Sequence, residues 1–207
     1  MLPEMNLGLP RSRVLLAAGA LVVAFAVRVA LSWLHATPNY FPDEYLNAAL
    51  GRSFGSFDGA TIRGGAAHFP ALLEPLLAAP VWHIGSVETA YRLVQIVHAA
   101  AFTLAAIPVY SIARRVGAGG KAALAVAAGA LLIPGALYAG FVLAEPVAYP
   151  LALAAVAAGI AALERPRLRT QWLFLACAAP IGVVRAKRQA PAGMRRIDRF
   201  GAGCAIA

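Results

Sequence analysis

Long apolar runs separated by short polar segments make up most of the chain. Four of them approach or reach the roughly 20 residues with which a helix crosses a bilayer. They are residues 14–34, 90–113, 122–139 and 146–163. A fifth run, residues 172–184, is short for a crossing helix. The pattern predicts an all-α, polytopic transmembrane bundle of four to five spans. Arg28 lies near the end of the first run, and we expect it to reach toward the membrane surface.

The charged residues alternate between the two sides of this predicted bundle. Cytoplasmic loops carry the excess of Lys and Arg in membrane proteins. With a cytoplasmic N-terminus, the inside segments hold Arg11, Arg13, Arg114, Arg115, Lys121, Arg165, Arg167 and Arg169. The outside segments hold Arg52 and Arg63, with Arg92 at the edge, and the acids Asp43, Glu44, Asp58, Glu74, Glu88 and Glu145. The rule predicts a multi-pass protein of the plasma (inner) membrane with an extracytoplasmic first loop, residues 35–89.

Composition supports a membrane protein and argues against a nucleic-acid partner. The chain is 61% hydrophobic and 13% charged, about half the ~25% charged residues of soluble domains. The net charge is +9, but the basic residues lie between apolar runs and form no RNA-reading motif. Cys177 and Cys204 form no disulfide framework and no metal-binding spacing. The expected surroundings of the chain are membrane lipids.

The acid pair Asp43 and Glu44 opens the predicted outer loop. Apolar residues recur after it at helical spacing, at Leu46, Ala49, Leu50, Phe54 and Phe57. This spacing predicts an amphipathic helix lying at the membrane surface. Asp43 at its start fits a helix cap. It equally fits a base that takes a proton from an acceptor hydroxyl or amine. A cap needs only one side chain, so Glu44 is left unexplained.

The rest of the loop and the next spans carry further candidates. Prolines at every fifth position between residues 68 and 85 predict short, broken helices around an enclosed space. His35, His68 and His83 match no metal-ligand spacing, so no metal is assigned. Gln95 and His98 are expected to make hydrogen bonds between helices.

Two charged residues at the ends of spans have both a structural and a site interpretation. Arg92 starts the second span and fits either ordinary interfacial anchoring or contact with a lipid phosphate. Glu145, followed by Pro146, fits an N-cap as well as a site role.

Four stretches in order resemble the GT-C class of polytopic glycosyltransferases, most closely the group of protein O-mannosyltransferases and lipid A aminoarabinose transferases. These stretches are "PDEYLNAAL", "HFPALLEPLLAAP", "AYRLVQIVHAAAFTLAAIPVYSIARRVG" and "LLIPGALYAGFVLAEPVAYPLALAAVAA". The resemblance covers roughly residues 10 to 176.

The resemblance implies transfer of a sugar from a polyprenyl-phosphate-linked donor to an acceptor on the outer face of the cell-envelope membrane. It implies that Asp43 activates the acceptor, with Glu44 beside it. Arg63 or Arg92 would stabilise the departing phosphate, and Glu145 is the remaining candidate for substrate binding. Some relatives use a divalent metal and others do not, so none is assigned.

The last residues differ in character from the rest. Residues 185–207 form a basic tail without apolar periodicity, after a transmembrane region at 1–184. Relatives of this class continue for several more helices. We therefore expect an N-terminal part of a longer enzyme, with a frameshifted or disordered tail. The alternative is a non-catalytic membrane protein, such as a permease subunit, an assembly partner or an inactive remnant. Polar residues concentrated in the first outer loop favour the enzyme.

Overall fold

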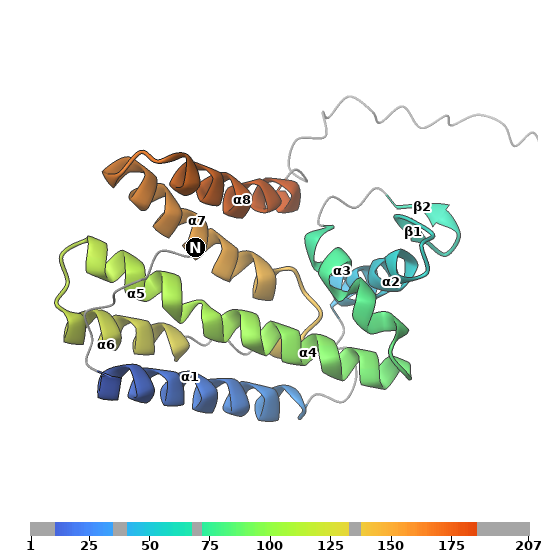
Figure 1. The fold of residues 1–207 in the computed structure, drawn as a ribbon. Coiled ribbons are helices and arrows are strands. Elements are labelled where there is room, and N and C mark those ends of the chain that lie inside the picture. The colour runs from blue at the N-terminus through green and yellow to red at the C-terminus, as the bar shows by residue number, and fades with distance from the viewer. Residues whose placement is uncertain (1–10, 35–40, 68–71, 133–137, 186–207) are drawn as a thin grey trace, which may run out of the picture.

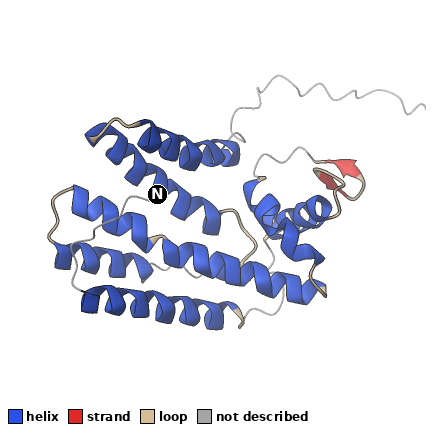
Figure 2. Ribbon diagram, in the orientation of Figure 1, coloured by secondary structure: helices blue, strands red, loops and turns tan. Residues whose placement is uncertain are grey.

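The protein is predominantly helical, with three helical segments long and apolar enough to cross a membrane (Figures 1 and 2). The computed structural model describes residues 11–34, 41–67, 72–132 and 138–185. The predicted tail from residue 186 onward, His35 and His68 lie outside these ranges. The candidate spans are Val14–Ser32, Val87–Arg115 and Glu145–Glu164. They correspond to the first, second and fourth predicted runs.

The first span is helix α1 (Arg11–Ser32), and the second consists of two helices in series. Helix α4 (Val87–Leu104) is followed by α5 (Ala106–Arg115), with one residue between them. Pro108 has no backbone N–H to give to the carbonyl four residues earlier, which accounts for the break. The fourth predicted run is α7 (Glu145–Glu164).

The third predicted run, residues 122–139, is not one continuous helix. Helix α6 (Gly120–Leu131) has 12 residues and ends well short of Ala139. From residue 138 to residue 144 the backbone forms a turn of 3-10 helix and then irregular structure. The sequence has Pro134 and Gly135 between these two parts, and both residues disfavour a continuing helix. A run of apolar residues therefore overestimated the helix.

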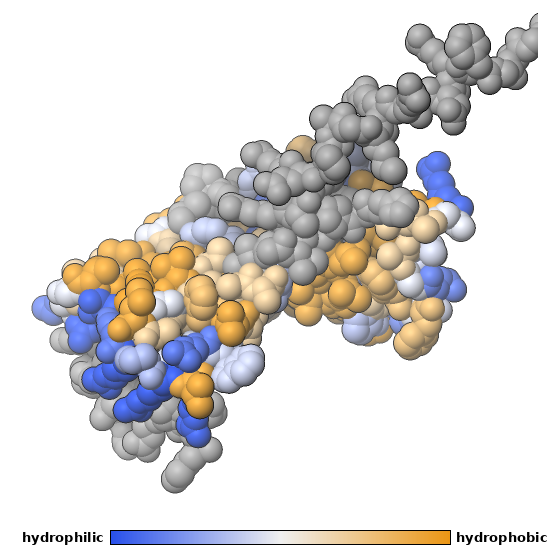
Figure 3. Space-filling model, turned by 90° about the horizontal axis from the view of Figure 1, so that it is seen from above, coloured by the Kyte–Doolittle hydropathy of each residue, from blue (hydrophilic) through white to orange (hydrophobic). Residues whose placement is uncertain are grey.

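A further helix, α8 (Leu168–Arg185), covers the predicted fifth run and packs along α7 (Figure 1). It is not among the candidate spans of the described chain. Exposed apolar side chains cover α1 and α8, among them Leu15, Leu16, Trp172 and Leu173. Apolar residues occupy much of the face seen in Figure 3, and hydrophilic residues gather toward its ends. Such a surface is compatible with membrane association.

The segment between the first two spans forms a separate lobe at one end of the bundle, which we call the end lobe (described residues 42–67 and 72–83) (Figure 1). It contains α2 (Pro42–Gly55), a hairpin of β1 (Thr61–Ile62) and β2 (Gly65–Ala66), α3 (Leu73–Ala78) and the 3-10 helix η1 (Ala79–His83). The proline-rich stretch thus contains two short helical pieces in place of a straight span.

Two glycines one turn apart on α2 let η1 approach closely. A Cβ atom on Gly51 would lie 2.5 Å from Nε1 of Trp82, and one on Gly55 would lie 2.9 Å from the Ala79 carbonyl oxygen. His83 also contacts the Gly55 carbonyl. Real side chains do not fit in such gaps, so α2, α3 and η1 pack as one unit.

The opposite end of the bundle is basic. The C-terminal ends of α5 and α7 and the N-terminal ends of α6 and α8 meet there (Figure 1). Arg115 forms an ion pair with Glu164 between two of these ends. The end lobe and this basic end therefore lie at opposite ends of the helices, as the charge alternation requires. Which end faces the cytoplasm stays a prediction.

Candidate functional site

The irregular segment at residues 138–144 is held by side chains from α2 and α4. The Gly140 carbonyl accepts a hydrogen bond from Nε2 of Gln95 at 3.0 Å. The Tyr91 hydroxyl lies 3.2 Å from the same carbonyl and 3.2 Å from Oε1 of Glu44, so its one hydrogen serves either acceptor. In a regular helix a backbone N–H would donate to the Gly140 carbonyl, and here side-chain donors take its place.

The peptide group between Phe141 and Val142 is bound on both sides. Nδ1 of His98 donates to the Phe141 carbonyl at 2.9 Å. The Val142 N–H donates to Oε1 of Glu44 at 3.0 Å. Nδ2 of Asn47 then donates to the Val142 carbonyl at 3.0 Å. We call the five side chains that bind residues 140–142 the clamp: Glu44, Asn47, Tyr91, Gln95 and His98.

All five clamp side chains are buried, with Glu44 and Gln95 at 0% exposure and Tyr91 at 3%. A buried backbone group left without a partner costs about 1–3 kcal/mol. Irregular backbone at membrane depth is tolerated only where protein satisfies it. The clamp therefore explains how the chain departs from helical structure between α6 and α7. The expected hydrogen bonds of Gln95 and His98 are present, although their acceptors are backbone groups.

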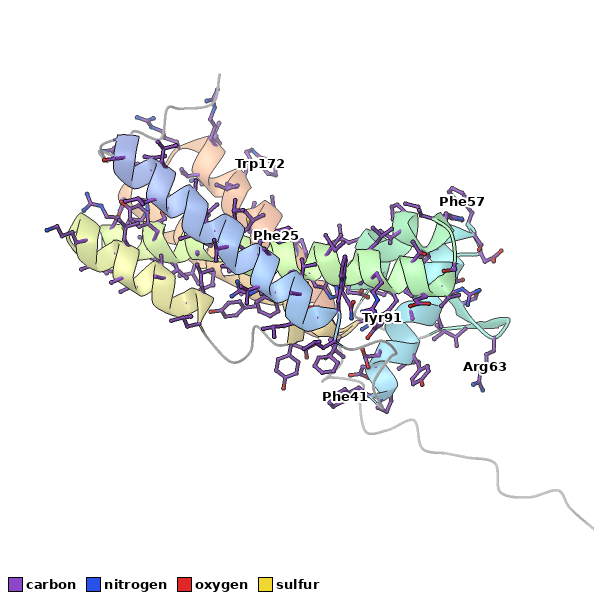
Figure 4. All side chains as sticks on the ribbon, turned by 90° about the horizontal axis from the view of Figure 1, so that it is seen from below. Phe25, Phe41, Phe57, Arg63, Tyr91 and Trp172 are labelled. Atoms are coloured by element: carbon purple, nitrogen blue, oxygen red, sulfur yellow. The ribbon has the colours of Figure 1, made fainter. Side chains whose placement is uncertain are left out.

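The structure separates the two acids of the pair. Glu44 points into the protein, whereas Asp43 is exposed. The N-cap of α2 is Phe41, which caps nothing with its side chain, and Asp43 lies inside the first turn after Pro42. The predicted cap by Asp43 is therefore wrong, because the helix starts at Pro42 and its N-cap lies two residues before Asp43. The Phe41 ring packs edge-to-face on Phe141, with centroids 5.6 Å apart, and fixes the start of α2 (Figure 4).

Arg92 joins the end of α1 to α4. Its Nη1 donates to the Trp33 carbonyl at 2.9 Å and lies 3.4 Å from Oε1 of Gln95. Nε2 of Gln95 also donates to the Ser32 carbonyl at 3.1 Å. Arg92 thus lies beside the clamp. Arg63 lies at the turn of the β-hairpin, exposed and at the far end of the end lobe from α1 (Figure 4).

Glu145 is exposed and is the first residue of α7 itself, and the N-cap is Ala144. The predicted N-cap is therefore wrong by one position. Its carboxylate still lies at the positive end of the helix dipole, which favours an acid there.

Arg28 does not reach toward the membrane surface as expected. It is 6% exposed, and its guanidinium donates to Oγ1 of Thr103 at 3.2 Å and to the Leu131 carbonyl at 2.5 Å. Leu131 is the last residue of α6, so Arg28 binds the negative end of that helix. An early end of α6, which the apolar pattern did not predict, gives Arg28 an internal partner.

A small cleft lies beside the clamp, between the end lobe, α4 and α7. Leu77, Ala78, Val81, Val94, Val97 and Val147 line it, together with Glu74 and His98. Nε2 of His98 lies 3.5 Å from Oε1 of Glu74, and both side chains are at most 2% exposed. No group of three or more His, Cys, Asp and Glu side chains that could hold a metal is found among the described residues.

Sequence reasoning missed Asn47 and Tyr91. Tyr91, Gln95 and His98 recur at spacings of four and three residues in an apolar helix. Such a polar stripe on one helix face is a signal that could have indicated the clamp.

No family model, curated protein or solved structure matches this chain.

Proposed function

We propose that this chain is a membrane glycosyltransferase of the GT-C class, or the N-terminal part of one. It would transfer a sugar from a polyprenyl-phosphate-linked donor to an acceptor at the outer face of the plasma membrane. The observation that carries the proposal is the unequal environment of the acid pair. Glu44 is buried and fixes α2, and this leaves Asp43 exposed on a restrained helix turn.

In the proposed reaction, the Asp43 carboxylate takes a proton from an acceptor hydroxyl or amine. The acceptor atom forms a bond to the anomeric carbon of the sugar as the bond to phosphate breaks. Polyprenyl phosphate leaves with the bonding electrons. The dipole of α2 stabilises the negative charge of Asp43, and the anchored Glu44 keeps the turn in one position.

The departing phosphate needs a cation near the same end of the bundle. Arg92 is the better of the two candidates, because it lies beside the clamp on α4. Arg63 is carried by a two-residue turn at the edge of the end lobe. Glu145, exposed at the start of α7, remains the candidate for contacts with the sugar.

A transfer assay tests the proposal. The full chain in lipid nanodiscs is incubated with polyprenyl-phosphate hexoses and pentoses and a membrane extract as acceptor source, and released polyprenyl phosphate is measured. The Asp43→Asn variant is expected to lose about 100-fold or more of the rate, the usual contribution of a general base. Asp58→Asn, another exposed acid of the end lobe, is the matched control. Equal transfer by Asp43→Asn and the parent protein contradicts the role of Asp43.

One observation favours the alternative of a non-catalytic membrane protein. Glu44, Asn47 and Gln95 bind backbone groups, so much of the polar interior has a structural purpose. An intact parent protein that releases no polyprenyl phosphate from any donor in the assay supports this alternative.

A further inference from the structure

Glu74 and His98 form a buried pair that joins the end lobe to α4. Nδ1 of His98 faces the Phe141 carbonyl at 2.9 Å, so Nδ1 carries a hydrogen. Nε2 then faces Oε1 of Glu74 at 3.5 Å. Without a proton on either group, a nitrogen lone pair would face a carboxylate in a buried site. A proton shared by the two groups would remove this repulsion.

The surroundings of the pair make the stability of the junction depend on the protonation of Glu74 and His98. The rest of the cleft is lined by apolar side chains, and neither carboxylate oxygen of Glu74 makes a hydrogen bond within the described residues. A buried charge that loses its partner is strongly destabilising. If the pair gained a second proton, the His98 imidazolium would lie beside a neutral Glu74 carboxylic acid. If it lost the shared proton, the Glu74 carboxylate would lie beside the Nε2 lone pair of His98.

The pair joins two parts of the protein. Glu74 belongs to α3 in the end lobe, and His98 belongs to α4 in the bundle. Other polar ties across this junction in the described chain include those of Glu44 and Asn47 to Val142 and the contact of the Tyr91 hydroxyl with Glu44. Within the end lobe, Gly51 and Gly55 pack against η1. A change at Glu74 therefore acts on the docking of the whole lobe.

Among the described residues, Glu74 and His98 are the only titratable side chains that line the cleft. Glu44 of α2 binds the far side of the Phe141–Val142 peptide group. Tyr91 and Arg92 lie about two turns away on α4, and η1 and α7 face the cleft with Val81 and Val147.

We propose that Glu74 and His98 form a proton-sensitive latch that docks the end lobe on α4. With one shared proton the lobe is docked, and gain of a second proton or loss of the shared one releases it. Gly85, with φ of 71°, lies between η1 and α4 and provides a hinge point. The latch needs no sugar substrate and is independent of the proposed transfer reaction.

Trp82 is a natural reporter of docking, because it packs on the core of Ala78, Tyr91, Val94 and Val142 where the lobe meets α4. Trp33→Phe and Trp172→Phe in the full chain leave Trp82 as the one tryptophan. Its acrylamide quenching is measured in nanodiscs from about pH 4 to about pH 9, a range that brackets ordinary carboxyl and imidazole titration. We expect quenching to rise by roughly twofold at one or both ends of the range, as for a local opening.

Two variants and a control make the result specific. Glu74→Gln replaces the carboxylate with a neutral amide that can donate to Nε2, and it is expected to flatten the profile. His98→Asn keeps a donor for the Phe141 carbonyl but removes the titrating ring, and it should also flatten the profile. His83→Gln, an exposed histidine next to the reporter, should leave the profile unchanged. A flat profile in the parent, a transition that persists in either variant, or one that vanishes with His83→Gln overturns the latch.

Discussion

Glu44 and His98 bind opposite sides of one peptide group. Glu44 accepts the Val142 N–H at 3.0 Å, and His98 donates to the Phe141 carbonyl at 2.9 Å. The first side chain comes from the end lobe and the second from a candidate span. The irregular segment before α7 thus links the lobe to the bundle, and its geometry depends on both side chains.

The two acids of the pair should differ in their effect on stability. Glu44→Ala removes the acceptor of the buried Val142 N–H, and it is expected to lower the free energy of unfolding by about 1–3 kcal/mol. Asp43→Ala, at an exposed position, should change it by no more than about 0.5 kcal/mol. Reversible unfolding in mixed micelles, followed by circular dichroism, gives both values. An equal loss in the two variants would contradict the structural role of Glu44.

Close packing of α2 on η1 makes Gly51 sensitive to any side chain. Gly51→Ala would bring a Cβ to 2.5 Å from Trp82, and it is expected to cost about 1–3 kcal/mol through overpacking. Gly19→Ala in α1 has no atom within 4 Å of its new Cβ and should leave stability unchanged or raised. The same unfolding measurement compares them. If Gly51→Ala is as stable as Gly19→Ala, the described packing of η1 is wrong.

Arg28 should not be replaceable by another cation. The guanidinium binds Thr103 through Nη1 and the Leu131 carbonyl through Nη2, a fixed spacing of donors that a single ammonium nitrogen does not reproduce. Arg28→Lys is expected to lower the free energy of unfolding by about 1.5–3 kcal/mol, as for a lost hydrogen bond to a charged group. Arg52→Lys, on the exposed face of α2, serves as the control and should be neutral. Equal stability of the two variants would mean that Arg28 does not hold the end of α6.

The orientation in the membrane is tested by cysteine labelling. With Cys177 and Cys204 replaced by serine, Asp58→Cys should react with an impermeant maleimide added to intact cells. Lys121→Cys should react only after the membrane is opened, because the positive-inside rule puts the basic end in the cytoplasm. The reverse pattern would invert the topology, and reaction of both in intact cells would exclude a membrane crossing between them.

Apolar run length predicted the helical class and the positions of α1, α4 with α5, and α7. It failed at α6, which ends at Leu131, because run length counts hydrophobicity and ignores the low helix propensity of the Pro134 and Gly135 that follow in the sequence. The expectation that Arg28 reaches toward the membrane surface is wrong because the early end of α6 was not predicted. A helix that ends inside the bundle supplies a carbonyl partner that a continuous helix would have used itself.

The acid pair stands out in the sequence because it follows an apolar run, yet spacing along α2 does not show which acid is buried. That depends on Val142, 98 residues away along the chain. The clamp is likewise made of contacts between residues distant in sequence. The spacing of Tyr91, Gln95 and His98 indicates a polar face on α4, but it does not show that this face binds residues 140–142.

Side chains of α2 and α4 are proposed to hold the irregular backbone of residues 138–144. Amide hydrogen exchange across these residues is the most direct test. Peptide-level exchange is followed in nanodiscs for the parent protein, Glu44→Ala and Asp43→Ala. We predict slow exchange in the parent and in Asp43→Ala, and exchange about 5- to 150-fold faster in Glu44→Ala, the equivalent of about 1–3 kcal/mol. Fast exchange in the parent, or equal protection in all three proteins, would contradict it.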